Sequence, residues 1–183
     1  MRITYNLINS FSPCYEPEEI DINAEYSATI PEFINEYRNK VKEKEDIVWT
    51  LCRNEFMSDQ DLRLFGVWCA RKVQYLMKDE RSVKALDIAE KYANGLATDE
   101  ELNAAKAAAS DAAGDAAYAA YAAAYAAYAA DWTAARAAAM AAASDAAWDA
   151  WDAAWDAAMD VQIDKLLEFF IAQENNLDFD WSK

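Results

Sequence analysis

The sequence contains a tract, from about Ala104 to Asp160, in which more than half of the residues are alanine. Alanine has the highest helix propensity, and Gly114 is the one helix-weakening glycine in the tract. The whole chain of 183 residues has only 3 Gly and 3 Pro, fewer than the turns of a sheet-rich fold require. These features predict an all-α protein: an antiparallel helical bundle with long alanine-rich helices and a short irregular N-terminal arm.

Aromatic residues interrupt the alanine tract at helical spacing. A first seam has steps of 3, 4, 3 and 4 residues: Tyr118, Tyr121, Tyr125, Tyr128 and Trp132. A second seam has steps of 3, 4 and 4 residues: Trp148, Trp151, Trp155 and Met159. Such spacing keeps each set on one face of a helix, as in the a and d positions of a heptad. Two facing seams would form a bundle core, and the alternative is an aromatic groove that stacks a ligand.

The motif AAASDAA occurs at 107–113 and again at 141–147. Its Ser-Asp pair suits a helix N-cap, so two or three antiparallel helices are expected to fold back at Ser110-Asp111 and Ser144-Asp145. The alternative is a single rod, in which roughly 57 residues at a rise of 1.5 Å would span on the order of 85 Å. The folded-back arrangement is favoured because a rod would leave the aromatic stripe without a partner.

Composition divides the chain into an N-terminal arm, residues 1–30, and a helical domain, residues 31–183. The arm contains two of the prolines and short β-branched runs, so we expect it to be irregular or to hold a short strand. Short helices are expected over 31–96 and long alanine-rich helices over 98–172. Local signals mark the expected helix starts and ends: Pro31, Ser58 with Asp61, Ser82, Gly95, and Thr98 with Glu101. A further apolar stripe is expected at Ile47, Val48, Leu51 and Cys52.

The residue types available for catalysis are limited. The chain has no histidine, which removes the commonest general base and most zinc and haem ligands. Its glycines stand alone, so there is no Gly-rich phosphate loop. Cys14, Cys52 and Cys69 lack C-x-x-C spacing and suit buried thiols in a reducing compartment. We therefore expect a protein that is not an enzyme and that binds no metal or cofactor, although carboxylate-pair chemistry stays open.

Acidic residues dominate the charge, with 33 Asp and Glu against 17 Lys and Arg and a net charge of −16. Direct binding of nucleic acid is not expected, because phosphates require a basic surface. The negative charge either keeps the protein soluble or matches a basic partner. The sequence shows neither a signal peptide nor a strongly apolar stretch of membrane-spanning length, so a cytoplasmic protein is expected.

Five aspartates recur along the second aromatic helix and are called the acidic row here: Asp145, Asp149, Asp152, Asp156 and Asp160. Their steps of 4, 3, 4 and 4 place them on one helix face, about 100° from the tryptophan seam. Successive carboxylates would lie roughly 5–6 Å apart, comparable to phosphates along a nucleic-acid strand. The row is either a solvated face or a partner-binding surface. The second interpretation predicts a basic protein partner and allows nucleic-acid mimicry.

The segment 61–109, DLRLFGVWCARKVQYLMKDERSVKALDIAEKYANGLATDEELNAAKAAA, and the alanine tract after it resemble bacterial and phage immunity proteins with an Imm-5-like domain. The matching features are Arg63-Leu64-Phe65, Trp68-Cys69-Ala70-Arg71, Arg81-Ser82, Ala89-Glu90, Gly95, and Thr98 with Glu101-Leu102. The resemblance covers roughly residues 45–172. It implies an all-α protein that neutralises a toxin or defence effector by binding it. Arg71 and Arg81 match the motif, and we expect them to pair with Asp79, Glu90 or helix C-termini.

Three functional hypotheses follow from the sequence. An acidic inhibitor of a basic toxin, nuclease or defence effector would show salt-sensitive, stoichiometric binding. A structural module whose aromatic seams pair between chains would form a homo-oligomer with little salt dependence. A small-ligand binder that uses the Tyr/Trp groove would show ligand quenching of tryptophan fluorescence. The acidic inhibitor is the favoured hypothesis.

Overall fold

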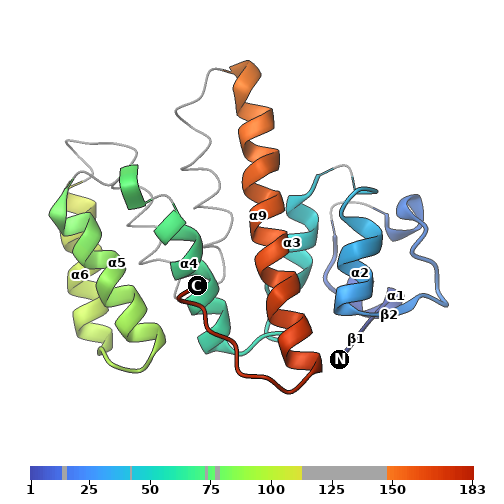
Figure 1. Cartoon of the computed structure of the whole chain (residues 1–183), viewed down its shortest axis with the longest axis horizontal. Coiled ribbons are helices and arrows are strands. Elements are labelled where there is room, and N and C mark those ends of the chain that lie inside the picture. The colour runs from blue at the N-terminus through green and yellow to red at the C-terminus, as the bar shows by residue number, and fades with distance from the viewer. Residues whose placement is uncertain (14–15, 42, 73, 77–78, 113–147) are drawn as a thin grey trace. The chain divides into compact units, whose positions relative to one another are not determined.

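The computed structural model describes residues 1–13, 16–41, 43–72, 74–76, 79–112 and 148–183, with 109–112 and 148–157 described at the level of the backbone (Figure 1). Over these residues the chain is mainly helical, with one two-stranded sheet, which confirms the expected helical class. The predicted antiparallel bundle and the fold-back at Ser144-Asp145 depend on 113–147 and lie outside the described residues. Among the described helices, none combines the length and the apolar character needed to cross a membrane.

The chain forms two compact units, and their boundary differs from the one predicted at residue 30. Unit 1 consists of Met1–Cys52 and Met159–Asp180, and unit 2 consists of Arg53–Ala158 and Trp181–Lys183. Unit 1 is therefore assembled from two segments far apart in the sequence. Composition describes the chain residue by residue, whereas a core is shared between segments, so composition alone carries no information about this pairing of segments.

The first thirty residues belong to unit 1 and form regular elements rather than the irregular arm expected. In chain order these are β1 (Arg2–Thr4), α1 (Tyr5–Ser10), a 3-10 helix (Pro17–Ile20) and β2 (Ser27–Thr29). β1 and β2 pair antiparallel with Ile3 opposite Ala28, which confirms the short strand. Ile3, Ile8 and Ile22 are fully buried, so this segment contributes to the core of unit 1.

Three helices complete unit 1: α2 (Ile30–Tyr37), α3 (Glu45–Leu51) and the part of α9 (Trp148–Glu174) from Met159 onward. A capping box begins α2, since Thr29 Oγ1 accepts from the Glu32 amide at 3.3 Å and Glu32 Oε2 accepts from the Thr29 amide at 2.7 Å. Pro31 lies in the first turn, as predicted. The large buried side chains of these helices include several that are at most 2% exposed: Phe33, Ile34, Tyr37, Ile47, Leu51, Ile163, Leu166, Phe169 and Phe170.

Unit 2 contains three consecutive helices: α4 (Asp59–Lys72), α5 (Glu80–Ala93) and α6 (Asp99–Ala112). Helix α5 packs against both α4 and α6. The predicted caps at Ser58 and Thr98 are confirmed, with Ser58 Oγ accepting from the Asp61 amide at 3.1 Å and Thr98 Oγ1 from the Glu101 amide at 3.2 Å. Gly95 follows α5 at φ +70°, the left-handed conformation that the sequence predicted.

Two helix starts predicted in unit 2 are wrong. Asp79 caps α5 in place of Ser82, because the Asp79 carboxylate accepts from the Arg81 amide at 2.8 Å and Ser82 is fully buried within the helix. Helix α6 runs through Ser110 and Asp111, so no helix begins there. Aspartate is as good an N-cap as serine and comes first at α5. At 110–111 the surrounding alanines favour continuing the existing helix over nucleating a new one.

Candidate acidic interface on helix α9

The acidic row runs along helix α9. Asp145 lies outside the described residues, and the backbone is helical from Trp148 onward. Asp149, Asp152, Asp156 and Asp160 therefore occupy successive turns of one helix, at register positions that share a side. Within the row, the structure describes side-chain contacts for Asp160.

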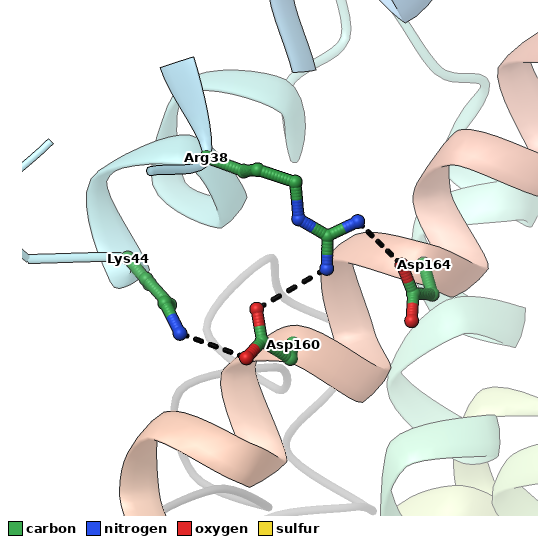
Figure 2. A network of polar contacts seen from close by, with 4 residues as sticks. All are labelled: Arg38, Lys44, Asp160 and Asp164. Carbon is green, nitrogen blue, oxygen red and sulfur yellow. Dashed lines mark hydrogen bonds and ion pairs between the residues drawn. The ribbon is translucent and has the colours of Figure 1, made fainter. Parts of the chain in front are cut away.

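The Asp160 carboxylate binds two cations from the link between α2 and α3 (Figure 2). Arg38 Nη2 donates to Asp160 Oδ1 at 3.2 Å, and Lys44 Nζ donates to Asp160 Oδ2 at 2.7 Å. Arg38 Nη1 also donates to Asp164 Oδ1 at 2.7 Å. One guanidinium thus bridges two carboxylates that lie one helical turn apart, while a lysine occupies the remaining oxygen of Asp160.

This network lies at the surface of unit 1, with the side chain of Arg38 22% exposed and that of Asp160 38% exposed. Burial alone would raise the pKa of Asp160, but the hydrogen bonds from Lys44 and Arg38 outweigh it and hold the pKa below its usual value. The hydrogen bond to Asp164 raises the pKa of Arg38. The charge of Asp160 is therefore balanced within unit 1.

Three residues of this network were not anticipated from the sequence. Asp164 follows Asp160 by the same step of four residues, so the spacing that identified the row could have identified it as well. Arg38 and Lys44 carry no comparable signal, because they lie 122 and 116 residues away from Asp160 in the sequence. Only the folding of both chain segments into one unit brings them to the row.

The two arginines of the resemblance motif have the internal partners that the sequence predicted. Arg71 Nη2 donates to Asp87 Oδ1 at 2.8 Å and to Glu90 Oε2. Burial would lower the pKa of Arg71, but the hydrogen bonds to Glu90 and Asp87 outweigh it and raise the pKa. Arg81 pairs with Asp79 at 2.8 Å. Both arginines therefore stabilise unit 2 from within.

The two aromatic seams lie only partly within the described residues. The first seam, Tyr118 to Trp132, lies outside the described residues, and the three tryptophans of the second are described by their backbone. Met159, which ends the second seam, is 1% exposed and belongs to the core of unit 1. A ligand-stacking groove along the seams therefore stays a prediction.

The described residues were also compared with the requirements of a metal site. Within this part of the chain, no three cysteine or carboxylate side chains are grouped so as to hold a metal ion. Cys52 and Cys69 are buried, as expected, and Cys14 lies outside the described residues. A cavity of about 290 Å³ in unit 1 has an apolar lining that includes Ile30 and Phe170, with Glu174 as the ionisable side chain among its described lining residues.

Comparison of the chain with protein-family models, with curated proteins and with solved structures finds no match. A function for this protein therefore has to be argued from its own residues.

Proposed function

We propose that this protein is a non-catalytic acidic binding protein that neutralises a basic effector, such as a toxin, nuclease or defence protein, by covering its basic surface. The observation that carries the proposal is the helical backbone of α9 through Asp149, Asp152 and Asp156. These positions follow one another at helical steps, and like charges at such steps repel by a few tenths of a kcal/mol per pair. A basic partner would remove that repulsion when it binds.

The charge and residue types of the whole chain support binding over catalysis. Acidic residues outnumber basic ones by 33 to 17, and the chain has no histidine. An excess of negative charge attracts a basic protein over long range and accelerates its association, an effect that salt weakens. The proposal therefore expects fast, salt-sensitive binding.

The contacts of Asp160 and Asp164 support the choice of a basic ligand. A guanidinium binds across these two carboxylates at 3.2 and 2.7 Å within unit 1. The pair Asp152 and Asp156 has the same four-residue separation on the same helix. Carboxylates at this spacing thus suit arginine side chains of a partner.

The sequence resemblance guides the choice of effector class. The resemblance of residues 45–172 to immunity proteins with an Imm-5-like domain favours a toxin or a defence effector. A nuclease target would make the acidic row a mimic of nucleic-acid phosphates, since successive row positions lie roughly 5–6 Å apart.

The proposal can be tested by capture from a bacterial lysate with three purified baits at low and moderate salt. These are the wild type, a row variant (Asp149→Asn, Asp152→Asn, Asp156→Asn) and a charge control (Glu16→Gln, Glu19→Gln, Glu25→Gln). Both variants lose three negative charges, and the control residues are exposed in unit 1. The captured protein is then purified and titrated against each bait by calorimetry.

We expect a basic partner that binds the wild type and the charge control with one-to-one stoichiometry. The row variant should bind it about tenfold more weakly or not at all, with a shallower salt dependence. Equal affinity of the three baits for every captured protein would contradict the proposal and make the row a solvated face.

A further inference from the structure

The turn between α5 and α6 of unit 2 contains the sequence Asn94-Gly95, so one of the three glycines of the chain follows an asparagine (Figure 1). Glycine has no side chain to shield its backbone nitrogen, and this nitrogen can attack the side-chain amide of the residue before it. Both residues are exposed. Beyond the chain neighbours, no heavy atom of the described residues lies within 4 Å of the position that a Gly95 Cβ would take. Water and sterics therefore leave the pair open to reaction.

Hydrogen bonds nevertheless hold the pair in an unreactive geometry at the end of α5. Gly95 N donates to the Tyr92 carbonyl at 3.0 Å, as in a Schellman motif, and Asn94 Nδ2 donates to the Glu90 carbonyl at 2.9 Å. At the Asn94 ψ of 7°, the Gly95 nitrogen nearly eclipses the backbone nitrogen of Asn94 rather than its Cβ. Closing a ring between the two residues therefore requires both hydrogen bonds to open and the Cα–C bond of Asn94 to rotate.

A side-chain hydrogen bond across the turn restrains this opening. Tyr92 Oη donates to Asp99 Oδ1 at 2.8 Å, which links the last turn of α5 to the first turn of α6. Helix ends open by local fluctuations that need less free energy than global unfolding. The stability of this turn therefore determines how often the Gly95 nitrogen is available for reaction.

We propose that Asn94 is a deamidation site, which converts to isoaspartate when the turn between α5 and α6 opens. The Gly95 nitrogen attacks Asn94 Cγ, the Cγ–Nδ2 bond breaks, and ammonia leaves with the proton of the Gly95 amide. Water then opens the resulting succinimide. Opening at the main-chain carbonyl gives isoaspartate, and opening at Cγ gives aspartate. One water is consumed and one ammonia is released, so the reaction needs no oxidant or reductant.

The modification destabilises the C-terminal end of α5. Both products place a carboxylate at this end, where the helix dipole disfavours negative charge. Isoaspartate also lengthens the main chain by one carbon, which displaces the Gly95 amide and the Leu96 amide that donates to the Lys91 carbonyl at 2.8 Å. The carboxylate of Glu90, one turn earlier, binds Arg71 of α4. Modification therefore loosens the part of α5 that lies next to this ion pair.

The rate of modification is measured on the full chain by mass spectrometry at mildly alkaline pH, with chromatography of proteolytic peptides to separate isoaspartate from aspartate. Wild type is compared with Tyr92→Phe, which removes the hydrogen bond across the turn and keeps the ring beside Arg63. The matched control Tyr5→Phe removes a hydroxyl that donates to Glu18 in unit 1. Each chain is also incubated in urea, where the turn is open throughout, and circular dichroism checks that both variants fold without it.

We expect Asn94 of the folded wild type to react about ten- to a hundredfold more slowly than in urea. Tyr92→Phe should raise the folded rate about fivefold and leave the rate in urea unchanged, whereas Tyr5→Phe should match the wild type in both conditions. A folded chain that forms no product at Asn94 while the urea sample reacts would overturn the proposal. Equal rates in the two conditions would overturn it as well, because the turn would then offer no protection.

Two further comparisons test the role of the turn and the effect of the product. Equal folded rates for Tyr92→Phe and Tyr5→Phe would show that Asn94 reacts only after global unfolding, which contradicts control by the turn. Hydrogen exchange of the purified isoaspartate form should be faster than that of the fresh chain at the end of α5 and the start of α6. Asn94→Asp, which adds the charge without lengthening the main chain, should show a smaller acceleration. Unchanged exchange in the isoaspartate form would contradict the loosening of α5.

Discussion

Each unit contains an arginine that bridges two carboxylates about one helical turn apart, and the two bridges arise differently. In unit 2, Arg71 of α4 binds Asp87 and Glu90 of α5, which follow 16 and 19 residues later. In unit 1, Arg38 binds residues of α9 that follow 122 and 126 residues later. Helices α4, α5 and α6 of unit 2 thus pack against their neighbours along the chain, although Trp181 also belongs to unit 2 and donates to Asp61 Oδ1 at 3.1 Å. Unit 1 instead combines two long segments that are far apart in the sequence.

The largest effect should come from truncating one core phenylalanine in each unit. Phe170 and Phe65 are 2% and 1% exposed, so substitution by alanine should cost about 3–5 kcal/mol of unfolding free energy in either case. Hydrogen exchange locates the damage. Phe170→Ala should accelerate exchange of the α2 and α3 amides, and Phe65→Ala should accelerate exchange in α4 and α5. Uniform acceleration in both variants would show that the two units unfold as one.

A smaller effect is expected from removing each bridging arginine. Arg38→Ala and Arg71→Ala should each lower the unfolding free energy by about 1 kcal/mol, because both side chains and their partners are partly exposed. The two networks share no partner, so the double variant should be additive within about 0.5 kcal/mol in urea denaturation. A clearly non-additive result would reveal coupling between the units.

The dependence of the unfolding free energy on pH should reveal the contribution of the Asp160 ion pairs in unit 1. A carboxylate whose pKa is lower in the folded chain stabilises the fold above its unfolded pKa, about 3.9 for aspartate, and this stabilisation is lost as the pH falls. The pKa of Asp160 is lowered in this way. Asp160→Asn should therefore flatten the decline in unfolding free energy below about pH 4, while Asp178→Asn, at an exposed position, serves as the control. Parallel pH profiles for wild type and Asp160→Asn would rule out this contribution.

The smallest effects concern the start of α5 in unit 2. Asp79→Ala should lower the thermal midpoint by a few degrees, because the helix loses its N-cap. Ser82→Ala should leave the midpoint unchanged or raise it slightly, since the Ser82 hydroxyl is buried without a hydrogen-bond partner. If Ser82→Ala were the more destabilising of the two, the assignment of Asp79 as the cap would have to be abandoned.

The sequence by itself determined the features that depend on residues close together in the chain. The caps at Ser58 and Thr98, the left-handed Gly95 and the pairing of Arg71 with Glu90 were all predictable. A cap involves residues within one helical turn, and the Arg71 contact needs only the packing of two consecutive helices. The helical course of α9 through most of the acidic row follows from the same local propensity.

Only the tertiary structure decided what unit 1 contains and what binds the end of the row. The strand pair β1–β2, the buried Ile3 and the binding of Asp160 by Arg38 and Lys44 all require segments that are far apart in the sequence. Local propensity carries no information about such encounters. They form because burying apolar side chains from both segments in one core stabilises the fold. The charged groups beside that core then lie close enough to form ion pairs.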